Sequence, residues 1–137
     1  MTRTRSMIAA SAVALMLALV PGRSSATPST FGVTVDPVGT FDAHTGQATI
    51  TGTVSCGSTS GFVDLEGNLR QFVGRVSTVF GSFIGDVPAC TPDASLPWSV
   101  TVEPTNGQFR GGSASANVRV AVDSSTAETS APVKLKR

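Results

Sequence analysis

Few residues of this chain carry groups that could do chemistry, and their spacing limits what that chemistry could be. The two cysteines, Cys56 and Cys90, lie far apart, so they do not form a CxxC redox motif. With a single histidine, they cannot complete a four-ligand zinc site. That histidine, His44, lies in the segment 42–46 (Asp-Ala-His-Thr-Gly), which is typical of a solvated turn rather than of a Ser/His/Asp triad.

Two carboxylates could imitate the acid pair of a glycosidase. Asp64 and Glu66 lie two residues apart, on the polar face of one predicted strand. Paired glycosidase carboxylates act beside a bound sugar, in a cleft that we expect aromatic side chains to line. This chain has no tyrosine, and its only tryptophan, Trp98, lies on an apolar strand face. The pattern therefore favours a solvated strand face on which Arg70 is the ionic partner.

Loop carboxylates could also bind calcium, and Asp36, Asp42 and Asp123 are the residues to consider. Their spacing does not match an EF-hand loop. No segment resembles a phosphate-binding loop. We therefore expect no catalytic residue, no metal site and no cofactor.

The beginning of the chain has the order of a secretory signal peptide. Arg3 and Arg5 form a short basic start, and residues 7–20 are an almost unbroken apolar run, too short to span a bilayer comfortably. Small residues at 24–26 (Ser-Ser-Ala) predict cleavage before Thr27. We expect 7–20 to be helical in the full chain without packing into the core, and 27–137 to form one domain.

Charge and hydropathy exclude several classes of protein. The formal net charge is +1, and the basic residues after the predicted signal are scattered, apart from Lys134, Lys136 and Arg137 at the end. Nucleic-acid binding would need clustered lysine and arginine, so we do not expect it. No second long apolar segment follows, which predicts an extracellular protein without a membrane span. In that oxidising compartment Cys56 and Cys90 should form a disulfide.

Short alternating runs predict an all-β fold. Apolar and polar residues alternate in four runs, namely 48–56, 63–70, 98–103 and 114–122. The segments 31–35 and 131–136 are weaker candidates. Together with 76–84 they predict about seven strands. The four alternating runs each have one solvent-exposed and one buried face, which favours a single antiparallel β-sandwich. We expect Trp98 to be a core aromatic residue.

The segment 76–84 is apolar on both faces. It is therefore either a central strand or an edge strand with an exposed apolar face, and no charge or proline lies between Val76 and Gly85 to guard it. We predict that part of it is exposed and contacts a partner or a second copy, with Val79 or Phe83 outermost. The candidate binding residues on and beside it are Phe72, Val79, Phe80 and Phe83.

Several short motifs together carry a family resemblance. They are Val-Thr-Val-Asp-Pro (33–37), Gly-Gln-Ala-Thr-Ile-Thr-Gly-Thr-Val-Ser-Cys (46–56), Leu-Arg-Gln (69–71) and Gly-Gly-Ser-Ala-Ser-Ala-Asn-Val-Arg-Val (111–120). The chain resembles small secreted actinobacterial proteins of unknown function with an immunoglobulin-like β-sandwich. The resemblance implies a fold and export, and it brings no catalytic residue. Trp98 follows Cys90, whereas the buried tryptophan of antibody domains lies between their cysteines.

Two classes of function remain. The first is a secreted, non-enzymatic module that binds a protein or a glycan. The second is a carrier of a small apolar ligand, similar to the sandwich proteins that hold an antibiotic chromophore, with Phe72, Phe80 and Phe83 lining the cleft. Those carriers usually have two disulfides, and this chain can form one.

Overall fold

The computed structural model describes residues 30–75 and 77–137. The predicted signal peptide 1–26, its helix over 7–20 and the predicted new terminus at Thr27 lie outside the described residues, as does Val76.

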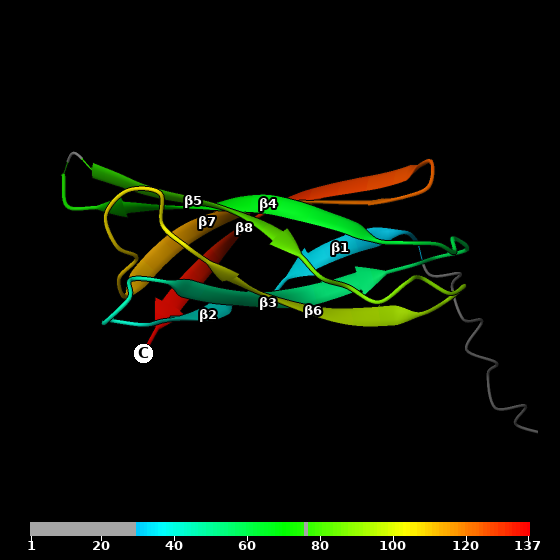
Figure 1. Cartoon of the computed structure of the whole chain (residues 1–137), viewed down its shortest axis with the longest axis horizontal. Coiled ribbons are helices and arrows are strands. Elements are labelled where there is room, and N and C mark those ends of the chain that lie inside the picture. The colour runs from blue at the N-terminus through cyan, green and yellow to red at the C-terminus, as the bar shows by residue number, and fades with distance from the viewer. Residues whose placement is uncertain (1–29, 76) are drawn as a thin grey trace, which may run out of the picture.

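Eight β-strands make up the regular structure of the described residues, and no helix occurs among them (Figure 1). The strands are β1 (Gly32–Val35), β2 (Val38–Phe41), β3 (Ala48–Ser55), β4 (Asp64–Val73), β5 (Ser77–Gly85), β6 (Ser95–Val102), β7 (Gly112–Val122) and β8 (Ser125–Lys136). Every predicted run corresponds to one of them, which confirms the all-β prediction. The sequence did not predict β2, and β8 begins six residues before the predicted run. The part of the chain that the structure describes contains no helix long and apolar enough to cross a membrane.

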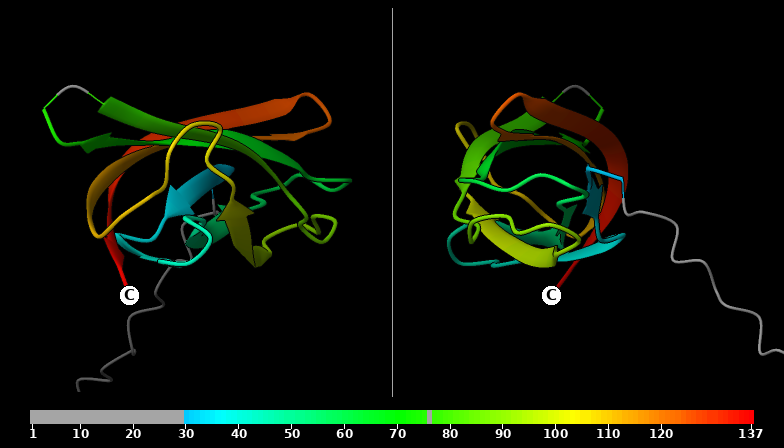
Figure 2. Two further views of the ribbon diagram at one scale, coloured as in Figure 1. Left: turned by 60° about the vertical axis from the view of Figure 1, so that its left-hand side comes forward. Right: turned by 90° about the vertical axis from the view of Figure 1, so that its right-hand side faces the viewer.

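The strands form one continuous mixed sheet that folds over itself. The pairing runs β5-β4-β7-β8-β2-β3, with β1 beside β2 on one side of β3 and β6 on the other. In Figures 1 and 2 the strands β5, β4, β7 and β8 form one layer and β3 and β6 lie in the other. The prediction of purely antiparallel pairing was wrong, because β2 runs parallel to β8, with Val38 opposite Lys134. This parallel pair joins the two layers.

Period-two alternation fills the space between the layers. Apart from Gln71, the buried residues on β3, β4, β6 and β7 are those that the sequence pattern placed on the apolar faces, and each is less than a tenth exposed. They include Ala48, Ile50, Val54, Leu65, Leu69, Trp98, Val100, Val102, Ala114, Ala116, Val118, Val120 and Val122. Phe109, from the loop before β7, is also buried in this core.

An aromatic pair at the centre of the core depends on two glycines. Trp98 and Phe83 stack with ring centroids 6.4 Å apart. Trp98 lies beside its cross-strand neighbour Gly52, and Phe83 lies beside Gly67 in the same way. A Cβ atom at Gly52 would lie 2.6 Å from the Trp98 ring, and one at Gly67 would lie 2.6 Å from the Phe83 ring. Each ring can therefore occupy its position only because the glycine opposite it has no side chain.

The disulfide predicted from the sequence is present. Cys56 and Cys90 are bonded and nearly inaccessible, and they join the end of β3 to the loop between β5 and β6. Backbone hydrogen bonds in both directions between Gly61 and Cys90 strengthen this junction. The disulfide therefore fastens the loops at one end of the fold.

Candidate functional site

The outward faces of β4 and β5 carry the exposed apolar side chains nearest to the predicted binding segment. Because side chains alternate along a strand, the even-numbered residues of both strands point away from the core. Phe72 on β4 is 83 % exposed and Ile84 on β5 is 85 % exposed. Phe80 lies between them and is half-buried, because the Arg70 guanidinium lies 5.3 Å from the centroid of its ring. These side chains form an exposed, partly apolar strip near the end of the sheet.

The other two candidate binding residues lie inside the fold. Val79 is 5 % exposed and Phe83 is 6 % exposed, so neither is the outermost residue of β5. Both occupy odd-numbered positions, whose side chains face the second layer. Ile84 takes the exposed place that the sequence analysis expected for one of them.

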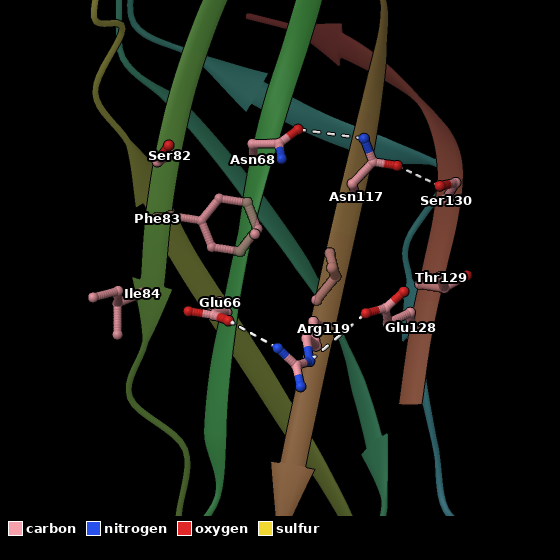
Figure 3. Close-up of a pocket in the computed structure, with 12 residues that line it drawn as sticks. Glu66, Asn68, Ser82, Phe83, Ile84, Asn117, Arg119, Glu128, Thr129 and Ser130 are labelled. Carbon is pink, nitrogen blue, oxygen red and sulfur yellow. Dashed lines mark hydrogen bonds and ion pairs between the residues drawn. The ribbon is translucent and has the colours of Figure 1, made fainter. Parts of the chain in front are cut away.

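Two polar rows cross the same outer face and line a shallow groove (Figure 3). The first row contains Ile84, Glu66, Arg119 and Glu128, and the second contains Ser82, Asn68, Asn117 and Ser130. The strand geometry places the rows about 7 Å apart. The groove that they border has a volume of about 820 Å³.

Each row is held together by contacts between neighbouring strands. Arg119 lies between two carboxylates, with 3.7 Å from Nη1 to Oε1 of Glu66 and 3.7 Å from Nε to Oε1 of Glu128. In the second row the Asn117 amide donates to Oδ1 of Asn68 at 3.3 Å and accepts a hydrogen bond from the Ser130 hydroxyl. These contacts fix the side chains across β4, β7 and β8.

The ionic partner of Glu66 was predicted wrongly. Arg70 has the same facing as Glu66 but lies four residues along the strand, where it covers Phe80. Arg119 is directly opposite Glu66 in the β4–β7 register. The sequence pattern of β4 alone could not reveal this neighbour. The side chains of these ion pairs are more than half exposed, so the pairs contribute little to the stability of the fold. Their main effect is to hold the charged side chains in position on the outer face.

A loop between β6 and β7 is fastened by two amide side chains that the sequence analysis did not single out. Gln71, only 2 % exposed, donates from Nε2 to the Arg110 carbonyl at 2.7 Å and accepts from the Arg110 N–H at 2.8 Å. Asn106 accepts from the Phe80 N–H at 3.0 Å and donates to the Thr78 carbonyl at 2.8 Å. The loop thus covers part of the outer edge of β5. The sequence does not reveal the role of these two amides, because their hydrogen-bond partners lie far away along the chain.

The remaining candidate residues are dispersed. His44 is exposed in a turn, where its backbone N–H donates to Oδ1 of Asp42 at 2.8 Å. Oδ2 of Asp36 accepts from the Thr51 hydroxyl at 2.5 Å, so Asp36 and Asp42 serve different local contacts. Within 30–75 and 77–137, no three histidine, cysteine or acidic residues are grouped so that they could hold a metal ion.

Comparison of the chain with protein-family models, with curated proteins and with solved structures finds no match.

Proposed function

We propose that this protein is a secreted, non-enzymatic binding module, and that the outer face of β5, β4, β7 and β8 contacts a partner protein. The observation that carries the proposal is the pair of large apolar side chains, Phe72 and Ile84, both more than four-fifths exposed on that face. Exposed apolar residues beside ordered polar groups are typical of interaction surfaces. The polar side chains of the two rows at the Ile84 end of this face would supply hydrogen bonds and fix the orientation of the partner.

An immunoglobulin-like arrangement is part of the proposal. Counterparts of the immunoglobulin strands A, B and E would be β1, β3 and β6, and the opposite sheet would contain β5, β4, β7 and β8 as C′, C, F and G. This chain departs from antibody domains at two points. Its disulfide joins β3 to the loop after β5 instead of joining the two sheets centrally, and Trp98 lies on β6.

Export of the chain is proposed on two grounds. The order of residues 1–26 is that of a signal peptide, and the bonded pair Cys56–Cys90 fits an oxidising compartment. N-terminal sequencing of the protein from the culture medium tests this proposal. A terminus at Thr27, or within a few residues of it, supports it, and material that retains residues 7–20 contradicts it.

Binding through the face can be tested with matched surface variants. The wild-type mature protein is immobilised and exposed to the extracellular proteins of its source, and Phe72→Lys and Ile84→Lys are compared with Thr101→Lys, an exposed position on β6. Loss of the same captured protein with both face variants, and its retention with the β6 variant, supports the proposal. Equal capture by all variants contradicts it.

The alternative, a carrier of a small apolar ligand, has less support because Phe83 and Val79 fill the core and the groove is lined largely by polar side chains. Native mass spectrometry of the protein purified from its source distinguishes the two functions. A bound small molecule of fixed mass would favour the carrier.

A further inference from the structure

The edge strand β5 lacks the features that protect the other free strand edges of this sheet from pairing with another chain. At the opposite end of the sheet, β6 contains Pro97, which has no N–H to offer a neighbour. The part of β8 beyond its pairing with β2 contains Glu128 and Pro132, and β1 is only four residues long. Short strands, charges and prolines are the usual protection against edge-to-edge pairing. From Ser77 to Gly85, β5 has neither a charge nor a proline, and its pairing with β4 has no bulge.

The alternation of the backbone determines which N–H and carbonyl groups of β5 point away from β4. We call such a group open where it has no hydrogen-bond partner. Both the N–H and the carbonyl of Phe80 point away from β4, because they bond Asn106 Oδ1 at 3.0 Å and the Thr105 N–H at 2.7 Å. In an antiparallel ladder every second residue has this orientation, so the backbone groups of Ser82 and Ile84 face the same way. Among the described residues, the hydrogen bonds from the loop to β5 end at Phe80, and the Glu103 carbonyl lies against the inner side of Gly81. The open part of the edge is therefore short and begins at Ser82.

We propose that a second copy of this chain pairs with this open edge, antiparallel and about a two-fold axis at Phe83. Ser82 of each copy would then lie opposite Ile84 of the other, and the two pairs would form four backbone hydrogen bonds. Two neighbouring registers are less favourable. Ser82 opposite itself would require the outward groups of Phe80, which Asn106 and Thr105 already occupy. Ile84 opposite itself would pair Ser82 with Asp86, which lies beyond the end of β5. Each strand of the pair ends at Gly85, before it reaches the loop that covers Phe80 on the other copy.

The exposed isoleucine supports the same register. Ile84 is diagonal to its own symmetry mate across the new strand pair, within reach of side-chain contact. Its side chain, 85 % exposed in the single chain, is thus partly covered by the second copy. The contact is small, so we expect a reversible dimer with a dissociation constant of roughly 10 µM to 1 mM. This inference does not depend on the proposed partner protein, because it concerns the purified chain alone.

Sedimentation of the purified, disulfide-bonded mature chain over that concentration range tests the proposal. The wild type should shift from monomer to dimer. Ser82→Pro removes an N–H that does not bond β4, so the fold should remain and two of the four intermolecular hydrogen bonds are lost, which weakens the dimer at least tenfold. Ile84→Lys should also weaken it at least tenfold, whereas Phe72→Lys, equally exposed but on β4, should leave it unchanged.

Amide hydrogen exchange locates the contact. Exchange at Ser82 and Ile84 should slow as the protein concentration rises, and exchange at Phe72, on the interior strand β4, should not change with concentration. A wild type that remains monomeric at 1 mM, or a dimer that is unaffected by both Ser82→Pro and Ile84→Lys, overturns the proposal. In either case the binding experiment on the outer face stands by itself.

Discussion

Replacing Trp98 by alanine removes the largest side chain of the core and tests how the two layers are joined. Trp98 is 3 % exposed, stacks on Phe83 from the opposite layer and donates from Nε1 to the Thr34 carbonyl at 3.2 Å. Loss of a buried aromatic side chain costs about 3–5 kcal/mol. The hydrogen bond contributes roughly another 1 kcal/mol. We therefore expect the free energy of unfolding to fall by about 4–6 kcal/mol.

That loss is large for a domain of this size, whose whole stability is expected to be about 5–15 kcal/mol. Urea unfolding monitored by far-ultraviolet circular dichroism measures it, because the alanine variant has no tryptophan fluorescence. Trp98→Phe provides a graded control, since it keeps a ring over Gly52 and loses the Nε1–H donor; we expect roughly 1–3 kcal/mol. A loss below about 1 kcal/mol for Trp98→Ala would refute the assignment of Trp98 as the centre of the core.

Three further perturbations address other parts of the fold. Replacing Cys56 and Cys90 together by alanine should lower the free energy of unfolding by roughly 3–4 kcal/mol, from the loop that the disulfide closes; equal urea midpoints for the two proteins would contradict this. Gly52→Ala would place a Cβ atom 1.9 Å from the Thr34 carbonyl oxygen. The free energy of unfolding, measured by thermal melting, should therefore fall by about 1–3 kcal/mol. The matched variant Gly32→Ala meets nothing closer than 3.9 Å and should melt like the wild type. Gln71→Leu leaves a backbone N–H and carbonyl of the β6–β7 loop without their partner, which should lower the free energy of unfolding by about 2–4 kcal/mol in urea. A change no larger than that of Gly32→Ala would argue against the role of this amide.

Local sequence pattern was sufficient for the faces of most strands. The alternation in 48–56, 98–103 and 114–122 identified the buried residues correctly, because side-chain direction along a strand depends only on position within that strand. Only one pairing of two cysteines is possible, so the disulfide also followed from the sequence. β2 was missed because only four residues form it, and its two large apolar residues, Val38 and Phe41, do not have the period-two spacing of a strand face.

The neighbours of each strand were decided only by the tertiary structure. Two-sided apolarity in 76–84 left open whether the strand was central or at an edge, and the pairing order places it at the end of the sheet. The outer position of Ile84 and the inner position of Phe83 follow from which layer β5 covers. Glu66 pairs with Arg119 instead of Arg70 for the same reason, since the β4–β7 register brings distant residues into contact.

The sequence by itself therefore determined the alternation of buried and exposed residues, the single disulfide and the all-β class. Alternation along a strand and the pairing of two cysteines can be read from the order of residues alone. The tertiary structure decided the parallel β2–β8 pair, the Trp98–Phe83 stack over two glycines, and the open backbone edge at Ser82 and Ile84. These features depend on contacts between segments far apart in the chain, and their register is fixed only when the two layers pack together.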